Sequence, residues 1–71
     1  MNRKFFVEFD IEVAQGTFVK GGCAVVFNSL EDAENTVIEL QHSEHTYKNI
    51  VIKSRVPEDA PGYLRLEKEY I

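Results

Sequence analysis

Residues 28–41, NSLEDAENTVIELQ, form the longest stretch of the chain with helical periodicity, and we expect them to decide the fold. Ser29 followed by Asp32, or Asn28 followed by Glu31, offers the spacing of a helix N-cap with its capping partner. The apolar side chains share one stripe at about 100° per residue: Leu30, Ala33, Val37 and Leu40. Ile38 lies on the shoulder of this stripe. The stretch therefore predicts a helix over residues 29–42 with one face buried against a sheet.

Three other segments have the pattern of strands. Residues 3–14 alternate, with Phe5, Val7, Phe9, Ile11 and Val13 on one side and Phe6, Glu8, Asp10 and Glu12 on the other. Residues 14–17 form a turn in which Gly16 supplies a positive φ, and an apolar segment over 18–27 gives a second strand. Residues 47–56 give a third strand, with Ile50, Ile52 and Val56 facing the helix. The tail, residues 62–71, favours a short fourth edge strand in which Leu64, Leu66 and Tyr70 share a side.

The second strand contains an interruption, Lys20-Gly21-Gly22. Paired glycines inside a strand are typical of a bulge, a longer loop or a close backbone approach. A phosphate-binding loop would place such glycines directly before the helix, and here residues 23–27 intervene. We therefore expect a structural irregularity at this position.

The order of these segments predicts an α+β fold, β-β-α-β, with a three- to four-stranded antiparallel sheet on one helix. Lys53 and Arg55 of the third strand have the right charge to lie across from Glu8, Asp10 or Glu12 of the first. This complementarity favours the strand order 2-1-3. A chain of 71 residues predicts a single domain, residues 1–71, with a small core.

Composition excludes several functional classes. A net charge of -4 and scattered basic residues argue against direct binding of nucleic acid, which needs clustered Lys and Arg. No apolar run is long enough to span a bilayer or serve as a signal peptide, so we expect a cytoplasmic protein with no membrane association. Cys23 is the single cysteine, which excludes an internal disulfide.

Two groups of residues are candidates for a metal site or a nucleophile, and neither has the pattern that such a site requires. His42 and His45 with Cys23 supply fewer than the four ligands of a structural zinc site, so a small metal-binding protein is the weakest alternative. Cys23 lies in an apolar segment, where a buried side chain is a commoner role than a nucleophile. We therefore predict no enzyme activity, no catalytic or metal-ligating residue, and no cofactor.

The row Glu8, Asp10, Glu12 is the most pronounced surface feature. Acidic side chains two apart on a strand are about 6.8 Å apart, half the charge density of a nucleic-acid strand, so an acidic docking patch is more credible than a full mimic. Its simpler interpretation is a solvated face partly neutralised by Lys53 and Arg55. Apolar side chains in excess of what one helix can cover indicate protein contacts. We predict partner-binding residues in both groups: Glu8, Asp10, Glu12, Phe6, Ile38, Tyr63 and Tyr70.

The strand-to-helix junction over residues 25–33, VVFNSLEDA, together with the overall layout, resembles small phage-encoded accessory proteins of the anti-CRISPR type. That resemblance implies stoichiometric inhibition of a bacterial defence complex by occupying a binding surface, such as a basic groove that holds nucleic acid. We expect a non-catalytic protein-interaction module. The alternative is a homodimeric structural or adaptor protein joined through the tail or the open sheet face.

Overall fold

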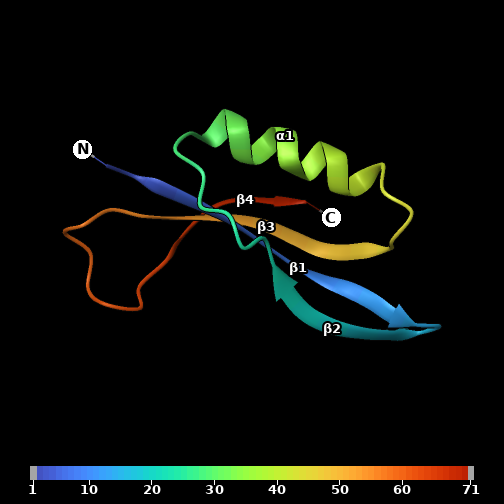
Figure 1. Ribbon diagram of the computed structural model, residues 1–71. Helices are drawn as coiled ribbons and strands as arrows, with labels where there is room; N and C mark the ends of the chain where they lie inside the picture. The colour runs from blue at the N-terminus through green and yellow to red at the C-terminus, as the bar shows by residue number, and fades with distance from the viewer. Residues whose placement is uncertain (1, 71) are drawn as a thin grey trace.

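The computed structural model describes residues 2–70 as one helix packed on a four-stranded antiparallel sheet (Figure 1). The strands are β1 (Lys4–Ala14), β2 (Thr17–Gly22), β3 (Tyr47–Arg55) and β4 (Arg65–Tyr70), and the helix is α1 (Leu30–Gln41). The sheet order is β2-β1-β3-β4, which confirms the predicted order 2-1-3 and adds the tail as an edge strand. No helix within these residues has the length and apolar character needed to cross a membrane.

The helix begins at the predicted cap. Ser29 has extended backbone angles, and its Oγ accepts a hydrogen bond from the backbone N–H of Asp32 at 3.1 Å. Asn28 is not the cap. Its Oδ1 accepts a hydrogen bond from Lys4 Nζ at 2.6 Å instead, so this side chain ties the start of the helix to β1.

The core lies between α1 and the two central strands, β1 and β3 (Figure 1). Ala33 and Val37 of the helix stripe are fully buried, and Leu30 and Leu40 pack at its ends. From the sheet, the buried core side chains are Phe5, Val7, Ile50 and Ile52. Val56 is also buried, but it follows the end of β3 and lies outside this cluster, so it does not join the helix-packed core as predicted. Ile38 is 51% exposed, as its position beside the stripe predicts.

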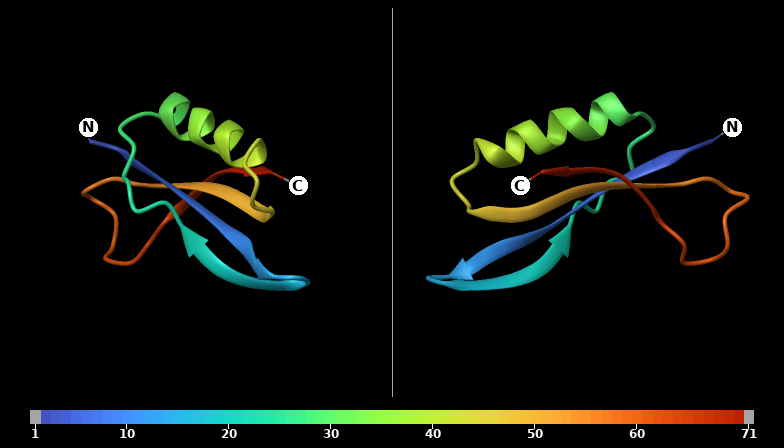
Figure 2. Two further views of the ribbon diagram at one scale, coloured as in Figure 1. Left: turned by 45° about the vertical axis from the view of Figure 1, so that its right-hand side comes forward. Right: turned by 180° about the vertical axis from the view of Figure 1, so that it is seen from behind.

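The β1–β2 hairpin projects beyond the end of the helix (Figures 1 and 2). The core-facing alternation of β1 continues into this projection without anything to cover it, because the 12-residue helix is too short to reach. Val13 is therefore 59% exposed and Val19 is 46% exposed. A register shift between Glu12 and Ala14 leaves Val13 without a partner on β2, which marks it as a bulge.

The predicted strand over 18–27 is wrong at its C-terminal end. Strand β2 stops at Gly22, and the ladder continues for one bond from the Cys23 N–H to the carbonyl of Val7 at 3.0 Å. The chain returns to β1 only at Phe27, which forms an isolated antiparallel bridge with Phe5. Four steps of chain from Cys23 to Phe27 span two steps of β1, so two extra residues bulge out.

The paired glycines serve a close approach, one of the roles expected for them. A Cβ on Gly21 would lie 3.2 Å from Cε1 of Phe9, and a Cβ on Gly22 would lie 3.0 Å from the carbonyl oxygen of Val7. Gly21 thus leaves room for the Phe9 ring, which packs edge-on against Tyr47 with ring centroids 4.8 Å apart. The glycines are a packing requirement of this sheet.

Candidate functional site

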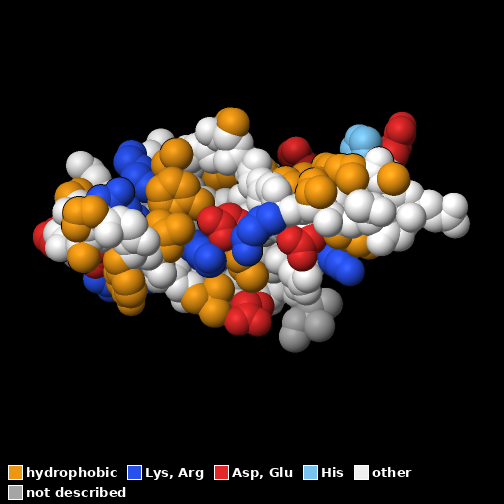
Figure 3. Space-filling model, turned by 90° about the horizontal axis from the view of Figure 1, so that it is seen from below, with side chains coloured by type: hydrophobic (Ala, Val, Ile, Leu, Met, Phe, Trp, Pro, Cys, Tyr) orange, Lys and Arg blue, Asp and Glu red, His pale blue; other side chains and the backbone are white. Residues whose placement is uncertain are grey.

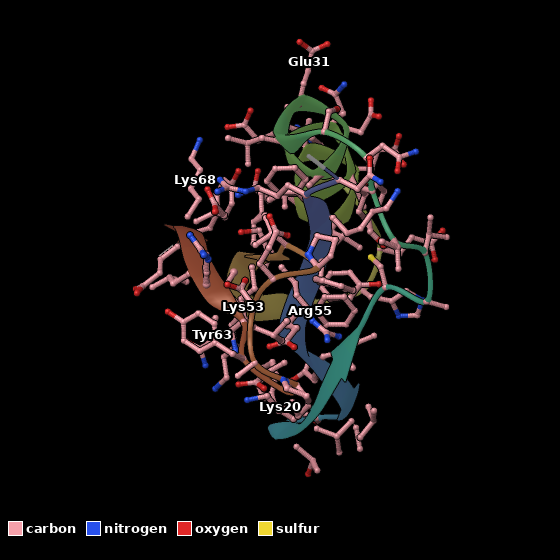
Figure 4. The ribbon with its side chains drawn as sticks, turned by 90° about the vertical axis from the view of Figure 1, so that its left-hand side faces the viewer. Lys20, Glu31, Lys53, Arg55, Tyr63 and Lys68 are labelled. Atoms are coloured by element: carbon pink, nitrogen blue, oxygen red, sulfur yellow. The ribbon has the colours of Figure 1, made fainter. Side chains whose placement is uncertain are left out.

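The face of the sheet turned away from α1 is the candidate site, and we call it the open face. Cross-strand pairing and strand alternation place on it Lys4, Phe6, Glu8, Asp10, Glu12, Phe18, Lys20, Lys48, Val51, Lys53, Arg55, Leu66 and Glu69. Figure 3 views the molecule from this side, with charged side chains at its centre and hydrophobic ones around them. In Figure 4, Lys20, Lys53 and Arg55 lie on the side away from the helix.

Glu8, the first acid of the predicted row, is paired within the sheet. Its Oε1 lies 2.9 Å from Lys53 Nζ, and both side chains are about one-third exposed, at 28% and 31%. Opposite charge between β1 and β3 was the basis for the predicted strand order, and this contact confirms that basis for Lys53. Arg55, the other base predicted to face the acids, pairs with Lys4 instead and forms no ion pair within residues 2–70. An ion pair this exposed contributes roughly 0.2–1 kcal/mol to stability.

Asp10 and Glu12 also have partners within the chain. Asp10 Oδ2 accepts a hydrogen bond from Asn49 Nδ2 at 2.8 Å, and Glu12 Oε2 accepts one from the backbone N–H of Gly16 at 2.8 Å. The second bond closes the hairpin turn, where Gly16 has a φ of 78° as predicted. All three acids of the row are therefore engaged in holding the sheet together, and their role in docking stays a prediction.

Cations flank the acidic row on both sides. Lys20 of β2 and Lys48 of β3 are the cross-strand partners of Asp10, and Lys48 Nζ lies 3.9 Å from the centroid of the Phe18 ring. The open face carries five basic side chains (Lys4, Lys20, Lys48, Lys53 and Arg55) and four acidic ones (Glu8, Asp10, Glu12 and Glu69). It has no acidic excess, although the whole chain has 12 acids to 8 bases.

The acidic excess lies around the helix. Glu31, Asp32, Glu39 and Glu44 are exposed on α1 and the segment that follows it, and none of them forms an ion pair within residues 2–70. Glu31 points outward from the start of the helix (Figure 4). Glu34 is different, because its Oε2 lies 2.8 Å from Lys68 Nζ of β4. The strongest uncompensated negative surface is thus on the opposite side of the molecule from the predicted row.

The apolar residues predicted to bind a partner fall in different places. Phe6 is half-buried on the open face, Tyr63 is 54% exposed and lies on the same side as Lys53 and Arg55 (Figure 4), and Ile38 is exposed on the helix. Tyr70 packs against the edge of the core beside its β3 partner, Ile50. The structure therefore brings Phe6 and Tyr63 to the open face and leaves Ile38 and Tyr70 elsewhere.

Leu66 is exposed, and its predicted place on the same side of the tail strand as Tyr70 is wrong. A register shift between Ile52 and Lys53 leaves Glu67 as a bulge on β4, so the simple alternation of the tail breaks there. Leu66 pairs with Lys53 on the open face and is 55% exposed, while Tyr70 lies on the helix side. Only knowledge of the bulge would have separated these two side chains.

A second feature that no sequence pattern indicated is a polar cluster around one buried serine. Ser54 is fully buried in the helix-facing row of β3, and its Oγ donates a hydrogen bond to Glu67 Oε2. Arg3 Nη1 lies 3.4 Å from the same carboxylate oxygen. The bulge aims Glu67 inward to satisfy Ser54, so this cluster fixes the edge strand. Ser54 has no access to a substrate.

The residues considered for metal binding or nucleophilic chemistry do not form a site. Within residues 2–70 no group of three or more His, Cys, Asp or Glu side chains is placed to hold a metal ion. Burial raises the pKa of the Cys23 thiol above its usual value of 9.0. The protonated thiol therefore predominates at neutral pH, and a thiol must be deprotonated to act as a nucleophile.

Comparison of the chain with protein families, curated proteins and solved structures found no match.

Proposed function

We propose that this chain is a non-catalytic protein-binding module that docks through its open face. The observation that supports this most directly is the one-sided cover of the sheet: α1 lies on one face, and no helix or strand of residues 2–70 lies on the other. Leu66 and Tyr63 are more than half exposed on this side. Exposed apolar side chains on a sheet face that no other element covers are typical of a protein-contact surface.

The internal pairing of the acids suits this role. Covering a charge with a partner is costly when that charge is left unpaired, and the cost falls when its own chain already supplies the counter-charge or hydrogen bond. Glu8, Asp10 and Glu12 each have such a partner. The open face can therefore be covered without leaving these carboxylates unsatisfied. Burial of the apolar side chains between them supplies the favourable free energy of binding.

For the class of partner we propose a bacterial defence complex, in the cytoplasm, on the resemblance to phage-encoded accessory proteins. Inhibition by occupying a surface needs no reacting group. The uncompensated acids around the helix, among them Glu31, Asp32 and Glu39, give the molecule a negative field. Such a field speeds the approach to a basic complex without forming the contact itself.

The test compares affinity capture by the wild-type chain and two matched variants in lysate of the host that encodes it. Leu66→Ser and Ile38→Ser remove aliphatic side chains of similar exposure, 55% and 51%, from opposite sides of the molecule. The proposal predicts that Leu66→Ser loses the captured protein and Ile38→Ser keeps it. The reverse pattern would assign docking to the helix and overturn the open-face proposal.

A further inference from the structure

A hollow of about 430 Å³ opens at one end of the open face. Its lining combines apolar and basic side chains with one neutral polar residue: Asn2, Lys4, Phe6, Val26, Arg55, Val56 and Pro57. Orange and blue side chains lie next to one another in the left part of Figure 3, toward the end of the molecule where residues 56–64 connect β3 to β4. No acidic side chain lines this hollow.

Two irregularities of the chain build its walls. The two-residue insertion before Phe27 brings Val26 next to Phe6 of β1, and Val26 remains 46% exposed there. On the other side, Val56 and Pro57 follow the end of β3, where the proline cannot continue the ladder. The hollow therefore lies where β2 has already ended and β3 is ending.

Lys4 and Arg55 form the basic rim, and their arrangement costs stability. They are direct cross-strand partners on β1 and β3, and like charges in this position repel one another. Lys4 donates to the neutral Asn28 side chain, and neither cation forms an ion pair within residues 2–70. Elsewhere on the open face the cations have acids beside them, as Lys53 has Glu8 and Lys20 has Asp10.

We propose that this hollow receives an apolar side chain of the partner protein, with an adjacent carboxylate of that partner placed between Lys4 and Arg55. The inference rests on the proposed protein-binding function and names the chemistry of one contact within it. The lining complements such a segment in both respects, since Phe6 and Val56 supply an apolar floor and the two cations attract the negative charge.

The depth of the hollow favours a protein segment over a free small molecule. Only Val56 among its lining residues is buried, so the hollow is shallow and open to solvent. A binding site for a small ligand usually covers roughly 70–90% of the ligand's surface. This open hollow does not provide that much cover. A side chain needs less cover, because the rest of its protein occupies the neighbouring surface.

The experiment titrates the ¹⁵N-labelled chain with a capped peptide, Gly-Gly-Phe-Asp-Gly-Gly, and follows the backbone amides by NMR. We expect shifts concentrated at Phe6, Val26 and Arg55. Replacing the peptide's Asp by Asn, or Arg55 by Glu in the chain, is expected to weaken binding by about two- to fivefold or more. Lys20→Glu makes the same change of charge on the open face outside the hollow and should leave the affinity unchanged.

The apolar half of the proposal has its own matched pair. Val26→Ser and Val19→Ser alter side chains that are each 46% exposed, and only the first lines the hollow. Val26→Ser should weaken binding of the peptide, and Val19→Ser should leave it unchanged. Octanoate, which joins an apolar chain to a carboxylate without a peptide, is titrated in parallel. Equal binding by all variants, no localised shifts, or binding of octanoate but not of the peptide would each overturn the proposal. If Leu66→Ser still loses the captured partner in that case, the protein-binding function stands without this contact.

Discussion

Asn49 donates a hydrogen bond from its Nδ2 to Oδ2 of Asp10 at 2.8 Å, and Asn49 is also the one non-glycine residue among 2–70 with a positive φ, 55°. The register between β1 and β3 shifts at this point, because two steps of β1 from Glu8 to Asp10 match three steps of β3. Asn49 therefore forms a bulge in β3 and links this bulge to the neighbouring strand β1 by a hydrogen bond. Asparagine tolerates this backbone conformation better than most residues.

Substitutions at Asn49 should separate its two roles. Asn49→Gly keeps the backbone conformation and loses only the hydrogen bond to Asp10. We therefore expect the free energy of unfolding to fall by about 0.5–1.5 kcal/mol. Asn49→Val should cost about 1–2 kcal/mol more, because a β-branched side chain is strained at positive φ. Urea denaturation measures both. Equal stability of the two variants would contradict the assignment of a strained bulge.

Two isoleucines test where the core lies. Ile52 is fully buried between β3 and the helix, and Ile38 is 51% exposed. We expect Ile52→Ala to lower the free energy of unfolding by about 2–5 kcal/mol, because it leaves a cavity. Ile38→Ala should change it by less than about 0.5 kcal/mol. Thermal and urea unfolding provide the comparison. A large loss at Ile38 would mean that the helix has another buried face.

The Asp59–Arg65 pair predicts a dependence of stability on acid pH. Hydrogen bonds from the Arg65 side chain and the Val56 backbone hold the pKa of Asp59 below its usual 3.8. Folding therefore favours the ionised carboxylate, and this stabilisation is complete above about pH 4 and is lost as the pH falls through the lower folded pKa.

We expect the urea midpoint of wild type to fall on acidification below about pH 4. Asp59→Asn should be less stable than wild type at neutral pH and should lose less on acidification. Glu58→Gln removes the same charge from an exposed neighbour without an ion pair in residues 2–70, and it serves as the control. Identical pH profiles for wild type and Asp59→Asn would exclude a stabilising role for this pair.

The edge strand β4 bears on the alternative of a homodimer. Its ladder is broken by the Glu67 bulge, and Lys68 and Glu69 place charges along it, which are two features that discourage edge-to-edge pairing. We expect sedimentation velocity to show a monomer at micromolar concentration, and Lys68→Val to increase self-association. A stable wild-type dimer would instead favour the structural or adaptor role.

The sequence was sufficient where a local pattern agreed with the final packing. The Ser29 cap, the Ala33 and Val37 stripe, the strand order and the Glu8–Lys53 pair all follow from spacing and charge. Each depends on the residues of one element or on one cross-strand pairing. Such features leave a clear pattern in the chain.

The sequence was insufficient where the register changed. The insertion before Phe27 shortened the second strand, and the bulge at Glu67 moved Leu66 to the face opposite Tyr70. Apolar residues such as Val25 and Val26 favour a strand in a prediction from sequence, whether or not their backbone pairs with a neighbouring strand. The hollow and its basic rim depend on this register, so no pattern along the chain reveals them.

The most direct test of the central claim is hydroxyl-radical footprinting of the chain alone and in the complex recovered by capture. The method reports the solvent access of individual side chains, and the two sides of the molecule carry suitable probes. Docking through the open face predicts that Phe6, Tyr63 and Leu66 lose labelling in the complex while Ile38 keeps it. Protection of Ile38 with unchanged labelling of the open-face residues would contradict the account.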